Sequence, residues 1–166
     1  MRPELAYYLI NSLFSMAPAA TAAVYVIFLL RSGLDFKGVA LVDGFYAVAS
    51  ALLDYPTGGL ADRYGRGATA SAGCLLMAAG LLAYSASSEL WQFLASEFLA
   101  ALGTALYSGS LQAWLAESLR EEGREGDLSR ALGRAGSLSW LLSLSLIHIS
   151  EPTRPRLISY AVFCLK

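Results

Sequence analysis

Three polar side chains lie within long apolar segments, where such groups can bind a proton or a polar solute. Asp43 and Glu97 are flanked by uncharged residues, and Asn11 lies in an uncharged stretch from residue 5 to residue 30. An ionisable side chain within a membrane span is costly and usually faces a bundle interior or a water-filled path. These residues are therefore the candidates for a substrate or proton site.

Helical spacing leaves two interpretations of these candidates open. Asn11, Ser15 and Pro18 share one helix face, which either lines a central cavity or bonds a neighbouring helix. We expect Asp43 and Glu97 at similar depth below the outer surface. Two carboxylates at one depth can share a proton, or they can lie on far sides of a bundle.

Asp54 is a third carboxylate, three helical turns after Asp43 and so on the same helix face. It lies close to the end of its apolar segment, with Arg63 and Arg66 following. We interpret it as a motif-supporting carboxylate that pairs with these arginines at the membrane surface.

The segments that carry these residues are long and apolar enough to cross a bilayer. Hydrophobic residues make up 56% of the chain and charged residues 15%, against about 45–50% and about 25% in soluble domains. A span needs about 20 apolar residues. The sequence predicts an all-α polytopic transmembrane helix bundle, with spans near residues 5–30, 38–59, 68–86 and 90–116 and a fifth helix from about residue 128.

Several function classes are disfavoured by composition. The net charge of −1 gives no basic footprint for nucleic acid. Cys74 and Cys164 are isolated, and His148 is the single histidine, so neither a disulfide framework nor a metal-spaced cluster is present in the sequence. No nucleophile–base pair is visible either. We expect no catalytic residue, no metal and no cofactor, and therefore not an enzyme.

A compact charged turn, residues 54–67, separates the second and third predicted spans. Pro56 is expected where the helix ends, and Gly65 suits a turn residue with positive φ. In the third span, Gly73 and Gly80 lie one heptad apart and predict close helix packing.

The core of this turn resembles the signature loop between the second and third helices of the major facilitator superfamily. The resemblance rests on Gly58, Leu60, Ala61, Asp62, Arg63, Gly65 and Arg66. It implies a cytoplasmic gating motif in which Asp62 steadies the outward-facing state. Gly67 departs from the pattern, which usually has a second basic residue there. The alternative is a basic loop that only fixes topology.

The resemblance also implies a function. The family fold has two six-helix halves with substrate bound between them, so residues 1–143 would be a partial N-terminal bundle. It implies secondary transport of a small molecule, with proton-coupled efflux as the expected subtype. This chain, as a fragment of such a transporter, is expected to be inactive by itself. Its partners would be the lipid bilayer, a substrate and protons. The alternative is a membrane-embedded structural or partner-binding bundle.

Basic residues predict the orientation. Seven arginines are expected on the side of the N-terminus and two basic residues, Arg31 and Lys37, on the other. The positive-inside rule then predicts that the N-terminus faces the cytoplasm. We expect the membrane to be the plasma membrane.

Residues 144–166 differ in kind from the rest of the chain. They resemble the in-frame translation of a transposon-end sequencing adapter, and we expect them to be a non-native tail. The alternative is a real fifth helix broken by Pro152 and Pro155.

Overall fold

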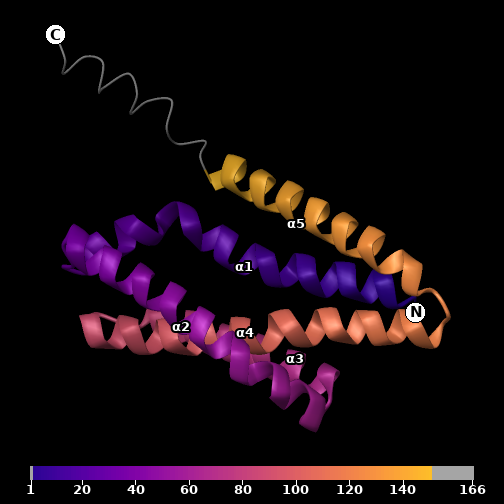
Figure 1. The fold of residues 1–166 in the computed structure, drawn as a ribbon. Coiled ribbons are helices and arrows are strands. Elements are labelled where there is room, and N and C mark those ends of the chain that lie inside the picture. The colour runs from indigo at the N-terminus through magenta and orange to yellow at the C-terminus, as the bar shows by residue number, and fades with distance from the viewer. Residues whose placement is uncertain (1, 151–166) are drawn as a thin grey trace. The chain divides into compact units, whose positions relative to one another are not determined.

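The computed structural model describes residues 2–150, which form five α-helices and one short 3-10 helix without any strand in that range (Figure 1). The elements are α1 (Pro3–Arg31), α2 (Phe36–Tyr64), α3 (Arg66–Ser85), α4 (Leu90–Glu121), η1 (Glu125–Asp127) and α5 (Leu128–Ser150). The all-α prediction is confirmed.

The chain forms two compact units. One comprises α1 as far as Val26 together with α5, and the other runs from Ile27 to Leu128. In the first unit the Asn11 side-chain amide donates to the Ser139 hydroxyl at 2.8 Å, which bonds α1 to α5.

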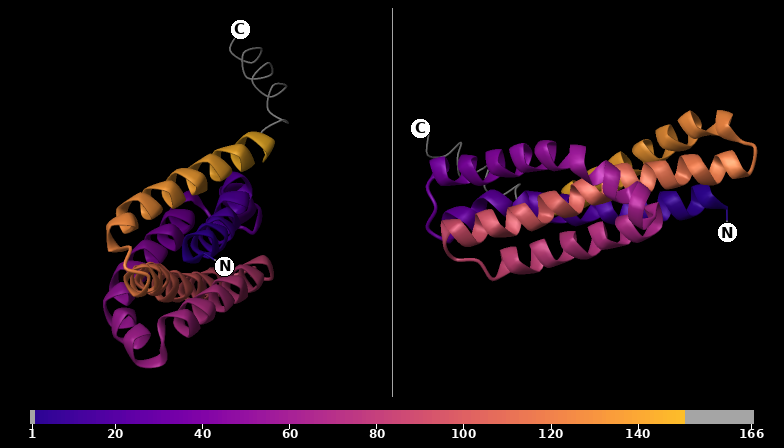
Figure 2. Two further views of the ribbon diagram at one scale, coloured as in Figure 1. Left: turned by 90° about the vertical axis from the view of Figure 1, so that its right-hand side faces the viewer. Right: turned by 60° about the horizontal axis from the view of Figure 1, so that its bottom comes forward.

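The second unit is organised around α4, which packs along both α3 and α2, whereas α2 and α3 contact each other less (Figure 2). Glycines allow the closest approach. A Cβ added at Gly103 would lie 2.6 Å from the backbone nitrogen of Met77, and one at Gly80 would lie 2.9 Å from that of Ala100. Gly73 meets Gly103 in the same way. The predicted close packing at Gly73 and Gly80 is therefore confirmed.

An aromatic cluster closes one end of this unit. The rings of Phe28, Tyr84 and Phe93 stand 5.0–6.0 Å apart between centroids, and Phe93 is fully buried. Ring pairs at such distances stabilise a core beyond their buried area. The cluster fixes the end of α1 against the α3–α4 turn.

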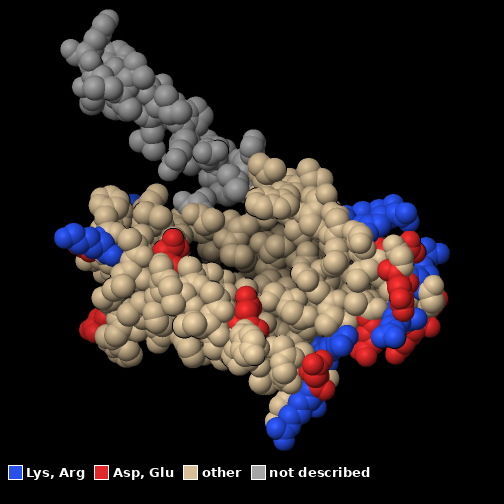
Figure 3. Space-filling view, viewed as in Figure 1, with Lys and Arg blue, Asp and Glu red and all other residues tan. Residues whose placement is uncertain are grey.

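Length and composition allow two described helices, α2 and α3, to cross a membrane, or three if the bent pair Pro3–Ala22 and Val24–Arg31 in α1 is one span. The span predicted over residues 90–116 lies in α4, whose 32 residues would reach about 48 Å at 1.5 Å each. Charged atoms gather toward the helix ends, around the α2–α3 junction and the connection from α4 to α5 (Figure 3). The number of spans stays a prediction.

The expectation that the second helix is ending around Pro56, with its span closing at residue 59, is wrong, because α2 continues to Tyr64. A proline within a helix leaves a carbonyl without its amide donor. The Thr57 hydroxyl donates to the carbonyls of Leu53 at 2.9 Å and Asp54 at 3.1 Å, which adds side-chain bonds to this turn. Most of the expected turn is thus helical, whereas Gly65 has the predicted positive φ, 90°.

Helix α5 begins at Leu128, as predicted, and continues to Ser150, seven residues into the expected tail from residue 144. Residues 151–166 lie outside the described residues, as do the side chain of His148 and all of Cys164. The adapter interpretation therefore stays a prediction.

Candidate functional site

The charged motif forms a sharp junction in which Gly65 alone separates α2 from α3. Its φ of 90° is one that side-chain-bearing residues rarely adopt, although a Cβ there would meet nothing within 4 Å. Glycine is therefore required for the backbone conformation rather than for space.

Arg66 is the residue that ties this junction to the bundle. Its Nη1 donates to the Ala113 carbonyl of α4 at 2.7 Å and lies 3.6 Å from Glu117 Oε2. Its Nη2 lies 3.7 Å from Asp62 Oδ1, one turn back across Gly65. A single guanidinium at the start of α3 thus contacts the last turn of α2 and the C-terminal part of α4.

Arg66 and its three contacts, Asp62, Ala113 and Glu117, form one cluster, and the side chains of its ion pair differ in exposure. The side chain of Arg66 is 29% exposed and that of Asp62 is 74% exposed. Exposed ion pairs at such distances contribute about 0–1 kcal/mol to stability. The Asp62 carboxylate therefore stabilises the bundle little and is accessible at its surface.

The motif was predicted from adjacent residues, and the structure brings Asp62 and Arg66 together as a pair. The Arg63 guanidinium lies 5.8 Å from the centroid of the Tyr64 ring instead. Gly58 and Leu60 are exposed on α2.

Ala113 and Glu117 were missed as parts of this cluster. They lie 47 and 51 positions beyond Arg66 in the chain, on another helix. One sequence feature could have indicated the Glu117 contact: Glu117 directly follows the apolar segment of residues 90–116, on the side of the membrane where Arg66 is also expected.

The three candidates for a substrate or proton site occupy different environments. Asp43 is exposed on α2, whereas Glu97 is buried on α4, with 9% of its surface exposed. Asn11 belongs to the other unit, where it bonds Ser139. This bond favours the helix-bonding interpretation of Asn11, and the proton-sharing interpretation of Asp43 and Glu97 stays a prediction.

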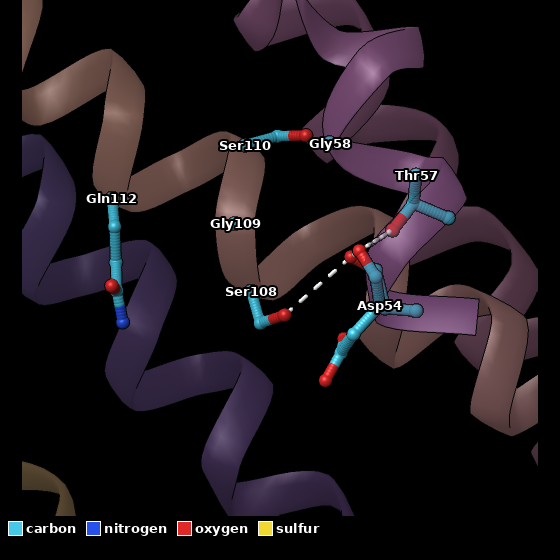
Figure 4. Close-up of a pocket in the computed structure, with 8 residues that line it drawn as sticks. Asp54, Thr57, Gly58, Ser108, Gly109, Ser110 and Gln112 are labelled. Carbon is cyan, nitrogen blue, oxygen red and sulfur yellow. Dashed lines mark hydrogen bonds between the residues drawn. The ribbon is translucent and has the colours of Figure 1, made fainter. Parts of the chain in front are cut away.

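Asp54 lines a hollow of about 340 Å³ between α2 and α4. Figure 4 shows Asp54, Ser108 and Gln112 at this hollow, with Gly58 and Gly109 on its walls. The expected pairing with Arg63 or Arg66 is not formed, since no ion pair of Asp54 is found among residues 2–150. Arg66 instead contacts oxygen atoms of Ala113 and Glu117 on α4 and of Asp62.

Helix packing explains the walls of the hollow. The Thr57 hydroxyl donates across to the Ala105 carbonyl of α4 at 3.2 Å, and Tyr46 and Thr104 hydroxyls lie 3.2 Å apart nearer the other end. These bonds join α2 to α4 along one seam. Below the Thr57 bond the small residues Gly58 and Gly109 leave space between the helices.

The described residues offer no group of three His, Cys, Asp or Glu side chains that could hold a metal ion. The polar groups at the hollow are one carboxylate with hydroxyl and amide groups. Such a set binds by charge and hydrogen bonding.

The fold and the charged helix junction define an integral membrane helix bundle. The family model described as Major Facilitator Superfamily matches residues 7–148, and the chain belongs to this family of transporters. No curated protein and no solved structure matches the chain.

Proposed function

We propose that the chain is the N-terminal bundle of a secondary active transporter that moves a small molecule by alternating access. The observation that carries the proposal is the family match over residues 7–148. The cluster at the α2–α3 junction supports it, because Arg66 of α3 bonds the Ala113 carbonyl of α4 and lies beside Asp62 of α2, which links the three helices at this junction. Rocking of rigid bundles about a central site is the mechanism of such transporters.

Asp62 is proposed as the gating residue. Its carboxylate is mostly exposed and only distantly paired with Arg66, so it can accept hydrogen bonds from another helix N-terminus. Arg66 is proposed as a positioning residue that holds the junction against α4. The exposed face of Asp62 supports a contact with an element of the second half.

The proton site is proposed at Asp43 or Glu97. Glu97 is the more buried of the two, and ionisable side chains inside a membrane span usually line a bundle interior or a water-filled path. Proton-coupled efflux is the proposed subtype. The described bundle contains five long helices, whereas a transport path in this family needs both six-helix halves, so residues 1–166 alone are proposed to be inactive.

The N-terminus and the α2–α3 junction are proposed to face the cytoplasm of a plasma membrane, on the strength of the arginine distribution. Ser32→Cys and Gly67→Cys, each made with Cys74 and Cys164 replaced by serine, test this. A membrane-impermeant maleimide added to intact cells should label the first variant alone, and the second only after permeabilisation. The reverse pattern would contradict the orientation.

The gating role is tested by Asp62→Asn in the protein encoded by the intact gene, since this change removes charge and keeps volume. Transport should fall at least about tenfold, equivalent to about 1.4 kcal/mol in the barrier, with membrane insertion unchanged. Glu121→Gln is the matched control, because Glu121 is an exposed carboxylate at the end of α4. Equal transport by both variants would leave the junction as a topology signal only.

A further inference from the structure

The hollow between α2 and α4 combines one negative charge with small and polar residues. Its lining residues are Asp54, Thr57, Gly58, Ala105, Ser108, Gly109, Ser110 and Gln112. Only Asp54 among them is ionisable, and none is aromatic or a large aliphatic residue. The lining therefore attracts a cation and has no large apolar side chain on which a lipophilic molecule could pack.

The Asp54 carboxylate is available to a ligand. It has no ion pair among the described residues, and its residue is exposed within the hollow. In Figure 4 the Asp54 side chain projects from α2 toward the space beside Ser108 of α4. A carboxylate in this setting accepts charge-assisted hydrogen bonds, which are about twice as strong as neutral ones.

The other polar groups are suited to hydroxyl-bearing ligands. The Ser108 hydroxyl donates to the Ala105 carbonyl at 3.4 Å, which is a long hydrogen bond that a ligand can replace. The Gln112 side-chain amide can both donate and accept hydrogen bonds. Thr57 is different, because its hydroxyl is buried and already bonds Leu53, Asp54 and Ala105. Thr57 therefore shapes the wall, and Ser108 and Gln112 are available for recognition.

The size of the hollow decides between an inorganic ion and an organic one. About 340 Å³ lies at the lower end of the ~300–1,000 Å³ of small-molecule pockets. A divalent cation needs six or more oxygen ligands in close contact, and the described residues provide no cluster of three metal-ligating side chains. Space and donor set both favour a small organic molecule.

We propose that this hollow binds a small hydroxylated organic ammonium ion, with its ammonium group on Asp54 and its hydroxyl groups on Ser108 and Gln112. The inference deepens the proposed transport function and rests on it for its physiological meaning. The site itself is formed by α2 and α4 alone, so binding can be measured without transport.

The experiment measures equilibrium binding of N-methyl-D-glucamine, a polyol that is cationic at neutral pH, to the full chain in lipid nanodiscs. Sorbitol is the neutral counterpart with the same hydroxylated carbon chain. We expect sorbitol to bind at least about tenfold more weakly, equivalent to about 1.4 kcal/mol. Equal binding of the two probes, or no binding of the cation, would overturn the proposal.

Two pairs of variants separate charge from space. Asp54→Asn should weaken binding of the cation about tenfold or more, whereas Asp54→Glu should retain most of it. Gly58→Leu should weaken binding by filling the hollow, and Gly59→Leu should not, since both glycines have open space beside them but only Gly58 lines the hollow. Circular dichroism checks that all four variants fold.

These outcomes are distinct from failure of the transport function. Unchanged binding in Asp54→Asn or in Gly58→Leu overturns the ligand site even if the intact gene product transports other solutes. Binding that depends on Asp54 and on Gly58 supports the site even if no transport of the probe is found.

Discussion

Replacement of Gly103 by alanine should loosen the α3–α4 interface, because no room for a methyl group exists there. A Cβ at Gly103 would lie 2.6 Å from Met77 N and 2.8 Å from Gly73 O, whereas ordinary contacts begin at 3.4 Å. Both opposing atoms belong to the backbone of α3, so rotation of a side chain cannot relieve the overlap. The helices must separate by roughly 0.8 Å at this point.

Forcing an extra methyl group into a well-packed interface costs about 1–3 kcal/mol. Alanine also favours a helix over glycine by about 0.8–1.0 kcal/mol, which offsets part of this cost. Gly109→Ala is the matched control, because Gly109 lies in the same helix with nothing within 4 Å of its added Cβ. The difference between the two variants isolates the overlap, and we expect Gly103→Ala to be the less stable by about 1–3 kcal/mol.

Unfolding by SDS in mixed micelles measures this difference, with tryptophan fluorescence as the signal. Thiol labelling of Cys74 adds a local measurement on α3, in a chain with Cys164 replaced by serine. In Gly73→Ala the added Cβ would lie 2.7 Å from the Gly103 carbonyl oxygen. The same separation of α3 from α4 would therefore relieve the overlap in both variants. The double variant should then cost less than the sum of the single ones. Equal unfolding midpoints for Gly103→Ala and Gly109→Ala would refute the packing argument.

Three further predictions concern the α2–α4 seam and the transport path. Thr57→Val should lower the free energy of unfolding by about 0.5–1.5 kcal/mol in the same titration, because the bond to Ala105 O is lost, while Thr57→Ser should not. In the intact gene product, Asp43→Asn or Glu97→Gln should abolish proton-driven transport yet allow exchange without a gradient; normal gradient-driven transport by both would exclude the proton site. Residues 1–166 reconstituted alone should give no saturable flux, and flux from this chain would show that the second half is dispensable.

The helices could be predicted from the sequence because apolar runs of about 20 residues have few other stable forms in lipid. The C-terminal ends of α2 and α4 could not. Helix α2 extends to Tyr64 and α4 to Glu121, and the charged residues in these last turns carry no hydrophobic signal that separates helix from loop. The expectation gave too much weight to Pro56, because a proline inside a helix removes one backbone hydrogen bond and can be accommodated without ending the helix, as it is in α2.

The candidate site could be predicted where its residues are neighbours in the chain. Asp62, Gly65 and Arg66 form one local motif, and the positive φ of Gly65 followed from residue type alone. The partners of Arg66 on α4 depend on how helices pack, which no local pattern specifies. Asp54 was assigned to the nearest arginines in sequence, but α2 instead directs it into a hollow beside α4.

Solute counterflow is the most direct test of the central claim that the chain belongs to a small-molecule carrier. Vesicles containing the intact gene product are preloaded with each unlabelled member of a panel of organic cations, anions and neutral solutes, and uptake of the labelled form is followed. A carrier that alternates between two faces should give a transient accumulation above equilibrium for at least one solute, and Asp62→Asn should abolish it. Uptake that never exceeds that of protein-free vesicles for any solute would contradict the account.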